Sequence, residues 1–449
     1  MTQRTPILLS DHFTIGRLIR FTLPSMLMVI ITSIYGVVDG IMVSNCVGTT
    51  AFAALTLIWP FVAVIGSFGF MMGTGGSALV AKRLGEQRDD DARSIFSLIT
   101  YATIFIAVTL GLLGRFVVGD VARVMGAEGE MVDLCCEYAD ILLLMMPAYM
   151  LQVFYQSLLV TAERPKMGMW ITICAGLMNM TLDVLFIYIF RWGLTGAAWA
   201  TALSQCVGAV VPLVYFIRCR HSKRATLWLG KTHLNMRALR KVCSNGMSEF
   251  VMNISLSVVS MLYMYKLLAE LGENGVSAYG VLMYYAFIFV AIFLGFGIGS
   301  APAISYHYGA QNHDELHSLF TKSLYIISVA GLLIAALAQL LAVPLSRSLV
   351  GYDATLLALT ITAFRIYCVH FLVTGVNCFA SSFFTALNNG PISALISMLR
   401  TIVFEAGCVL VMPLVFGIES IWWSVTVAES LTLLVTIFLF IHYRKRYNY

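Results

Sequence analysis

Charged residues are scarce in this sequence. Only 11% of its 449 residues are Asp, Glu, Lys or Arg, whereas 59% are hydrophobic, and an ordinary soluble domain is about one-quarter charged. No soluble core hides that much apolar surface, so the composition excludes a soluble globular protein. Apolar stretches of about twenty residues, the length that crosses the hydrocarbon of a bilayer, follow one another along the chain. The sequence therefore predicts an all-α integral membrane protein.

Several familiar motifs are missing as well. The ten cysteines are scattered without metal-ligand or disulfide-framework spacing, which argues against a zinc centre or a disulfide scaffold. No Walker motif is present, so the chain itself is not expected to hydrolyse ATP, and nothing resembles a nucleic-acid module. The net charge of +5 favours anionic lipid headgroups as neighbours. The first apolar stretch, Phe21–Val43, is too long for a cleavable signal peptide and is expected to be the first span.

Breaks at clusters of charge, Gly and Pro divide the chain into twelve predicted spans. Most Lys and Arg residues fall in alternate loops, including the stretches 82–93 and 218–241. By the positive-inside rule this bias places both termini in the cytoplasm, which requires an even number of spans. The predicted spans are residues 17–44, 51–81, 94–118, 131–161, 167–190, 194–218, 240–270, 275–307, 317–345, 352–387, 391–416 and 418–442.

The two halves of the chain repeat one another at a constant offset. The stretch Gly85–Asp90 matches Gly309–Asp314, and the same offset pairs Thr161 with Thr385. Each half has six spans, so both halves enter the membrane from the same side and the repeats are parallel, as in carriers whose two lobes rock around a shared site. The alternative is an old duplication kept only for packing. We expect lobes at residues 1–218 and 240–449, joined by a cytoplasmic connection at 219–239.

Carboxylates inside spans are informative because each costs about 2.5–3.5 kcal/mol to insert. Asp39 lies roughly 28 Å beyond Arg20, and Asp183 roughly 26 Å beyond Lys166, at 1.5 Å per helical residue. Both acids therefore belong at a similar depth, in the outer half of the bilayer.

Two polar residues extend this acidic pair. Asn179 precedes Asp183 by one helical turn and shares its face, and Thr201 returns to a comparable depth in the next span. Two carboxylates, an amide oxygen and a hydroxyl suit a hard cation such as Na⁺. The set is equally able to hold protons, because burial and a neighbouring carboxylate both favour the protonated acid. The alternative is that these residues only join neighbouring helices by hydrogen bonds.

The second half carries different ionisable residues inside its spans. Arg400 and Glu405 are too far apart along one helix to pair ideally, so each needs a partner elsewhere. They are candidates for a second-lobe site or for neutralising one another across helices. The single His370 is expected to be a polar packing residue. The remaining intramembrane charges are Glu249, Arg365 and Glu429.

Taken together, these residues resemble the multidrug and toxic compound extrusion (MATE) family, in particular its bacterial branch related to DinF and MepA. The likeness covers essentially the whole chain. It rests on the two six-span halves and their Gly85 and Gly309 motifs, on Asp39 in the first span, and on Asn179 with Asp183 in the fifth. The resemblance implies a twelve-helix fold in two parallel six-helix repeats. It also implies an exporter that expels cationic, lipophilic compounds in exchange for Na⁺ or H⁺.

The resemblance also assigns roles to individual positions. It makes Asp39, Asn179, Asp183 and Thr201 the cation-coupling set, and the Na⁺ ligands if the exporter is sodium-coupled. It puts Tyr35, Tyr138 and Met180 in or near the substrate cavity and makes Pro24, inside the first span, a hinge. A second ion site in the other lobe would involve Glu249, Arg400 and Glu405.

Two other functions stay open at the level of sequence. A lipid-linked oligosaccharide flippase shares the broader architecture but favours a cationic cavity. A membrane-embedded transferase would need a donor-binding loop and a paired His or Asp motif, and neither is present. We expect no enzyme activity and no cofactor beyond the coupling ion. The expected neighbours are small cationic substrates and lipids, without nucleic acid, around a monomer in the bacterial inner membrane.

Overall fold

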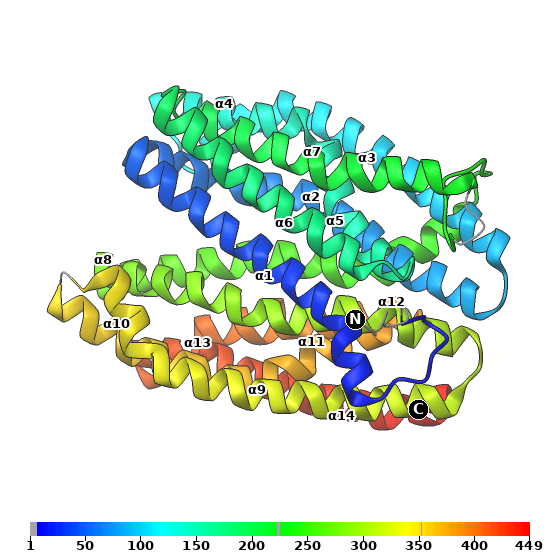
Figure 1. Cartoon of the computed structure of the whole chain (residues 1–449). Helices are drawn as coiled ribbons and strands as arrows, with labels where there is room; N and C mark the ends of the chain where they lie inside the picture. Colours follow the sequence, from blue (N-terminus) through cyan, green and yellow to red (C-terminus); the bar gives the residue numbers. More distant parts are fainter. Residues whose placement is uncertain (1–6, 222–224, 352) are drawn as a thin grey trace, which may run out of the picture.

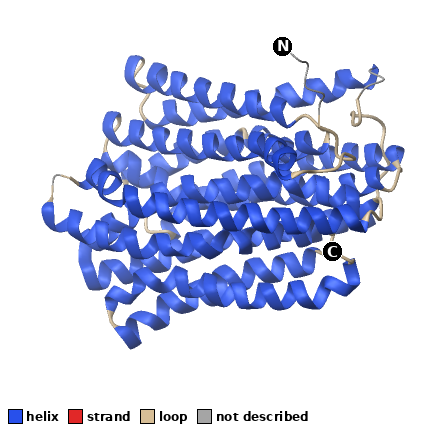
Figure 2. Cartoon of the chain, turned by 60° about the horizontal axis from the view of Figure 1, so that its bottom comes forward, coloured by secondary structure: helices blue, strands red, loops and turns tan. Residues whose placement is uncertain are grey.

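The computed structural model describes residues 7–221, 225–351 and 353–449. These residues are nearly all helical, and no strand occurs among them (Figure 2). Eleven helices are long and apolar enough to cross a membrane. A twelfth span results if Glu130–Leu144 and Met146–Thr161, bent by 57° at a short break, are taken as one. The predicted all-helical fold with twelve spans is thereby confirmed. Residues 1–6, 222–224 and 352 belong to the predicted first lobe, connection and tenth span and lie outside the described residues.

The helices form two groups, one above the other in Figure 1. We call helices α1–α7 the first lobe and helices α8–α14 the second lobe. The end of the bundle that carries both chain ends and the connection between the lobes is the terminal end, and the opposite end is the far end. The helices are α1 (Ile15–Cys46), α2 (Thr49–Gly85), α3 (Asp89–Val124), α4 (Glu130–Leu144), α5 (Met146–Thr161), α6 (Pro165–Asp183), α7 (Leu194–Arg218), α8 (Met236–Gly309), α9 (His313–Val350), α10 (Ala354–Tyr367), α11 (Phe371–Ala386), α12 (Gly390–Met398), α13 (Ala406–Phe416) and α14 (Ser424–Tyr447).

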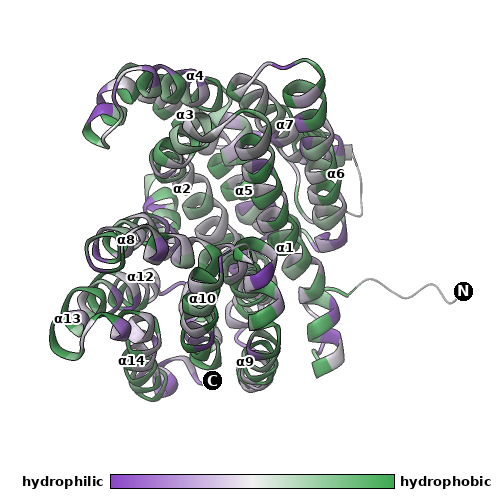
Figure 3. Ribbon diagram, turned by 90° about the vertical axis from the view of Figure 1, so that its left-hand side faces the viewer, coloured by the Kyte–Doolittle hydropathy of each residue, from purple (hydrophilic) through white to green (hydrophobic). Residues whose placement is uncertain are grey.

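Several helices are longer than the predicted spans, because their ends project beyond the apolar stretch. α3 begins at Asp89, five residues before the predicted span, and carries three Asp residues in its first turn. Acidic side chains there stabilise the positive end of the helix dipole. α8 contains two spans and is broken at Gly272, whose φ of 64° interrupts the helix. Viewed along the helices, hydrophobic residues dominate the bundle (Figure 3).

The repeated sequence motifs adopt repeated backbone conformations. Gln87 and Gln311, at the same place in the two Gly-x-Gln turns, both have positive φ, 61° and 54°. Gly193 and Gly417 share positive φ values of 63° and 82°, each just before a helical segment. Non-glycine residues rarely adopt this region, so the matching turns support a duplicated chain.

The lobes touch backbone to backbone toward the terminal end. A Cβ on Gly75 of α2 would overlap the carbonyl oxygen of Val242, and one on Gly246 of α8 would overlap that of Met71. Gly85 and Gly309 make the same kind of contact at the ends of α2 and α8. We call these four glycines and their contacts the seam. Only glycine permits this approach, so the seam closes the terminal end of the bundle.

Helix α1 links the lobes. Its first half packs on α8, where a Cβ on Gly299 would lie 2.9 Å from the Cα of Thr22, and its second half packs on α6, where Tyr35 covers Gly176. Pro24 lies where the first half meets α8. The segment that carries Asp39 therefore belongs to the first lobe, while the start of the same helix is held by the second.

The residues before α1 tie both lobes together. The backbone N–H of Leu9 donates to Glu163 Oε1 in the α5–α6 turn at 2.8 Å. The N–H of Phe13 donates to Glu315 Oε1 in α9 at 2.8 Å, and Lys322 Nζ donates to the Phe13 carbonyl. Burial raises the pKa of Glu163 above its ordinary value. This segment therefore spans the lobes at the terminal end, on the same side as the seam.

The described part of the connection between the lobes packs along α3. The N–H of Gly230 donates to Ser97 Oγ at 3.0 Å, and Thr232 Oγ1 donates to the Ser94 carbonyl at 2.8 Å. The guanidinium of Arg93 lies 3.8 Å from the centre of the Trp228 ring. Residues 225–232 are thus attached to the first lobe.

Replacing Gly246 by Ala is expected to weaken the seam by about 1–3 kcal/mol, because the new methyl group has no room against the α2 backbone. We expect a membrane-impermeant maleimide, applied at the terminal end, to label Cys243 faster in the variant when Cys243 is the single cysteine retained. The matched control is Gly280→Ala on the same helix, where a Cβ meets nothing within 4 Å. Equal labelling rates for Gly246→Ala and the parent would contradict this role of the seam.

Candidate functional site

The two first-lobe acids come together although they lie far apart in sequence. Asp39 on α1 and Asp183 at the end of α6 lie close enough for their carboxyl groups to interact. Asp39 is 9% exposed and Asp183 is fully buried. Asn179 Nδ2 donates to Thr201 Oγ1 on α7 at 3.4 Å. The structure therefore brings together all four residues of the predicted cation-coupling set, and we call them the acidic cage.

The acidic cage is short of donors. Asp39 Oδ1, both carboxylate oxygens of Asp183 and Asn179 Oδ1 are buried without a hydrogen-bond partner among the described residues. Gln152 Oε1 on α5 and Gln205 Oε1, one turn after Thr201, are in the same situation. All six are acceptor oxygens, and each buried acceptor without a partner costs about 1–3 kcal/mol. A proton shared by Asp39 and Asp183, or a cation bound among the oxygens of Asp39, Asn179 and Asp183, would satisfy the acceptors of the cage, so the set fits a hard cation.

Both predicted tyrosines lie at the acidic cage. Tyr138 on α4 is 1% exposed and lies in the electrostatic field of Asp39 and Asp183. Tyr35, one turn before Asp39, interacts with Asp39 and with Gln152. Met180 is partly buried, but it follows Asn179 directly and so projects about 100° around α6 from the Asn179–Asp183 face. The tyrosines thus border the cage more closely than Met180 does.

Each lobe has a π-helical segment beside its charged residues. The segment Val184–Ile189 begins directly after Asp183, and the segment Leu399–Glu405 contains Arg400 and Glu405. Both segments lie in the corresponding span of each repeat. A π-helical turn widens the helix locally and is frequent at functional sites. No sequence signal indicated either segment.

The buried charges of the second lobe meet around Glu429, which is 2% exposed. Arg400 Nε donates to Glu429 Oε1 at 2.7 Å, and Asn377 Nδ2 donates to Glu429 Oε2 at 2.7 Å. Arg400 Nη1 also donates to Cys378 Sγ at 3.1 Å. The ion pair thus joins Arg400 to α14, so Arg400 has the partner elsewhere that its distance from Glu405 along the helix indicated, and the alternative of mutual neutralisation with Glu405 is not the pairing formed. Sequence reasoning noted Glu429 but gave it no role, and it missed Asn377.

Three carboxylates surround a single guanidinium in this region. Glu249 and Glu405 both lie in the field of Arg400, and Glu405 also faces Glu429. Since Glu429 already pairs with Arg400, the other two acids have no cation of their own here. His370 is hydrogen-bonded to Thr374 Oγ1 at 2.7 Å, which fits the packing role predicted for it.

Parallel repeats of membrane-spanning helices with a buried acidic cage define a multi-pass membrane transporter. The chain belongs to the MatE family, whose model matches residues 24–185 and 250–409. It is 21% identical over 432 residues to the multidrug export protein MepA of Staphylococcus saprophyticus, covering 96% of this chain and 94% of that one. These relatives are transporters and not enzymes, as the sequence predicted.

Two solved structures have the same fold. One is described as the outward-facing conformation of a multidrug resistance MATE family transporter of the MOP superfamily. It is 22% identical with a TM-score of 0.90, covering 100% of this chain and 99% of that one. The other is a crystal structure of MATE in complex with MaL6, 21% identical with a TM-score of 0.90 and 97% coverage of both chains. The twelve-helix fold in two parallel repeats is therefore confirmed.

Replacing Glu429 by Ala is expected to destabilise the protein by about 3–5 kcal/mol, because it leaves the buried guanidinium of Arg400 without its carboxylate. The measurement is the thermal unfolding midpoint in detergent. Ser430→Ala is the control, since Ser430 is the exposed neighbour of Glu429. The double variant Glu429→Ala with Arg400→Met should recover part of the loss. An unchanged midpoint for Glu429→Ala would show that the ion pair does not stabilise the lobe.

Proposed function

We propose that this protein is a secondary active antiporter that exports cationic, lipophilic drugs in exchange for Na⁺ or H⁺ by alternating access. The observation that carries the proposal is the acidic cage, in which acceptor oxygens of Asp39, Asn179 and Asp183 are buried without donors. The carboxylates attract either a coupling ion or a cationic drug. Coupling then requires that the ion and the drug favour different conformations.

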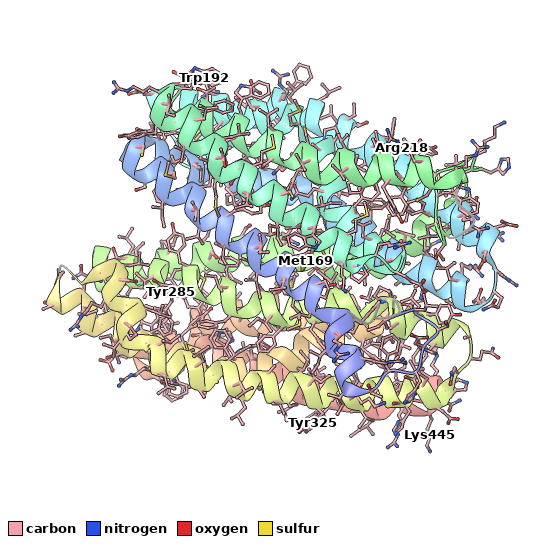
Figure 4. All side chains as sticks on the ribbon, viewed as in Figure 1. Met169, Trp192, Arg218, Tyr285, Tyr325 and Lys445 are labelled. Atoms are coloured by element: carbon pink, nitrogen blue, oxygen red, sulfur yellow. The ribbon has the colours of Figure 1, made fainter. Side chains whose placement is uncertain are left out.

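The orientation follows from the distribution of basic residues. Arg218 and Lys445 lie at the terminal end and Trp192 lies at the far end (Figure 4). By the positive-inside rule the terminal end faces the cytoplasm, so both chain ends are cytoplasmic, here in the bacterial inner membrane. The seam then closes the cytoplasmic side, which leaves the far end as the side from which an ion would reach the acidic cage. This is the state in which a drug is released and a coupling ion enters.

The moving part is assigned to α1. Its start is held against the second lobe by Gly299 and by the contacts of Phe13, whereas Asp39 belongs to the first lobe. Neutralising Asp39 by a proton or Na⁺ changes the charge at one end of a helix whose other end lies at the seam. Pro24, which lacks the N–H that continues the helix, allows α1 to bend between the two attachments.

The nature of the substrate is inferred from charge and from the relatives. An anionic cage flanked by Tyr35 and Tyr138 suits an aromatic or lipophilic cation, since tyrosine faces attract cations. The similarity to proteins named multidrug export protein supports a broad set of such compounds. A flippase for lipid-linked oligosaccharides fits less well, because Arg400 is neutralised by Glu429 and Arg365 is exposed on α10. We assign the monomer as the transporting unit.

Replacing Asp39 by Asn is expected to abolish coupled export while leaving the protein folded, because the substitution removes the charge and preserves the shape. The assay is uptake of ethidium into proteoliposomes under an imposed Na⁺ gradient or an imposed pH gradient. We expect at least about a tenfold loss in rate, which corresponds to about 1.4 kcal/mol of activation free energy.

Asp120→Asn is the control for this experiment. Asp120 is an exposed acid on α3 in the same lobe, paired with Arg123 at the surface, and its loss should leave the rate unchanged. Wild-type activity in the Asp39 variant would overturn the assignment of Asp39. A wild-type protein that moves no ethidium under either gradient would overturn the antiport itself.

A further inference from the structure

A chain of hydroxyl groups runs through the interior of the second lobe. Ser397 Oγ and Ser381 Oγ are 3.1 Å apart, Ser381 Oγ and Ser393 Oγ are 2.9 Å apart, and Ser393 Oγ and Thr385 Oγ1 are 2.8 Å apart. Thr385 Oγ1 continues to Ser248 Oγ on α8 at 3.4 Å. Each link joins two groups that both donate and accept hydrogen bonds. Ser393 Oγ also donates to the Ser381 carbonyl at 2.7 Å, so transfer along the chain requires rotation of the O–H bonds but no movement of the side chains.

The chain is buried except at Ser381, which is partly exposed, and the first lobe lacks it. Ser393 is fully buried, and Ser397 and Thr385 are at most 5% exposed. At the offset that pairs Gly85 with Gly309, Met169 and Ile173 stand where the second lobe has Ser393 and Ser397. Met169 lies in the middle of the molecule, between the two lobes (Figure 4). The shared fold therefore does not require hydroxyl groups at these positions.

The chain begins at a small cavity beside Glu249. Glu249, Ser381, Ser397 and Arg400 line this cavity together with Asn377, and it offers ≈ 10 Å³ to the centre of a water molecule. About that much space is needed for one water, so a drug does not fit, whereas a proton carried by water does. The charged or titratable groups that face Glu249 are Arg400 and the thiol of Cys378.

The other end of the chain lies under an amide pair at the seam. Asn245 Nδ2 donates to Asn388 Oδ1 at 2.7 Å, and Thr385 Oγ1 donates to the Asn245 carbonyl at 3.2 Å. Asn388 Nδ2 also donates to the carbonyl of Ala78 on α2, in the other lobe, at 3.3 Å. We call Asn245 and Asn388 the amide cap. Because the cap is bonded across the seam, parting of the lobes at the cytoplasmic side removes one of its contacts.

We propose that this hydroxyl chain carries protons from Glu249 to the cytoplasm and that the amide cap closes it while the seam is closed. The proposal rests on proton coupling in the proposed function. The O–H bond of the Glu249 carboxylic acid breaks as a cavity oxygen takes the proton, directly or through one water. Each hydroxyl then passes its own proton to the next oxygen, so every O–H bond broken is matched by one formed. Thr385, which donates to the Asn245 carbonyl while the seam is closed, gives its proton to a water that enters when the seam opens, so that a hydronium ion forms and Glu249 is left as a carboxylate.

The cap prevents a leak. With the seam closed, Glu249 takes protons from the outside and the cytoplasmic end of the chain is covered. With the seam open, water reaches Thr385 and the proton is released. A relay that was open at both ends would dissipate the proton gradient. Because Asn388 is bonded across the lobes, proton release occurs when the lobes part at the cytoplasmic side, which is also when the drug site is exposed there.

The test compares Thr385→Val, which removes the hydroxyl at nearly constant shape, with Thr385→Ser, which keeps it. In proteoliposomes loaded with a pH-sensitive dye, proton flux driven by a pH gradient in the presence of ethidium should fall at least about tenfold in the valine variant. The serine variant should retain it, and ethidium binding in detergent should change in neither. Ser393→Ala should act like Thr385→Val. The matched control is Thr161→Val, the repeat-related residue of the first lobe, which bonds Ser77.

Each outcome bears on a different claim. Unchanged proton flux in Thr385→Val, with a proton-driven wild type, overturns the relay and leaves the antiport standing. A wild type driven by Na⁺ alone, without proton movement, also overturns the relay only. A wild type that moves no ethidium under either gradient overturns the antiport and the relay with it. Equal losses in Thr161→Val and Thr385→Val would assign the hydroxyl to packing.

Discussion

A carboxylate buried in a bilayer must be neutralised, and the organisation of this protein depends on how each lobe meets that requirement. In the second lobe, Glu429 receives a guanidinium and an amide from Arg400 and Asn377. In the first lobe, Asp39 and Asp183 face each other, and oxygens of both lack donors among the described residues. Such a pair is stable only with protons or a cation bound. The first lobe, whose buried carboxylate oxygens lack donors, is therefore suited to reversible binding of an ion.

The acidic cage is connected to both lobes through α1 and the residues that precede it. Asp39 shares α1 with contacts to the second lobe at Gly299, and the residues just before α1 reach Glu163 in one lobe and Glu315 in the other. The glycine seam is a close contact between backbones, so even a small separation would open voids and lose packing. In the proposed mechanism, neutralisation at the acidic cage acts through α1 on this contact.

The sequence was sufficient for the features that depend on periodicity and on single residues. Apolar length set the twelve spans, the constant offset revealed the repeat, and depth along the helices grouped Asp39 with Asp183. The sequence did not predict which residues pair when the partners lie on different helices. The spacing of Arg400 and Glu405 indicated that each needs a partner elsewhere, but it did not identify Glu429 on α14 as the partner of Arg400. The connection near Trp228 packs on α3 through backbone bonds that polar composition does not reveal.

The repeat in the sequence predicts the backbone turns that the two lobes share, but it does not predict the side-chain contacts in which they differ. Both lobes keep the turns at Gln87 and Gln311, since these are fixed by backbone conformation. The interiors have diverged, because side chains that do not face the seam are free to change. Met169 and Ile173 fill space in one lobe where Ser393 and Ser397 form a polar chain in the other. Buried hydroxyls need a hydrogen-bond partner, which Thr100 and Thr360 find in a backbone carbonyl and the hydroxyls of this chain also find in one another. A linear chain of them that ends at the contact between the lobes therefore joins the interior of the second lobe to its contact with the first.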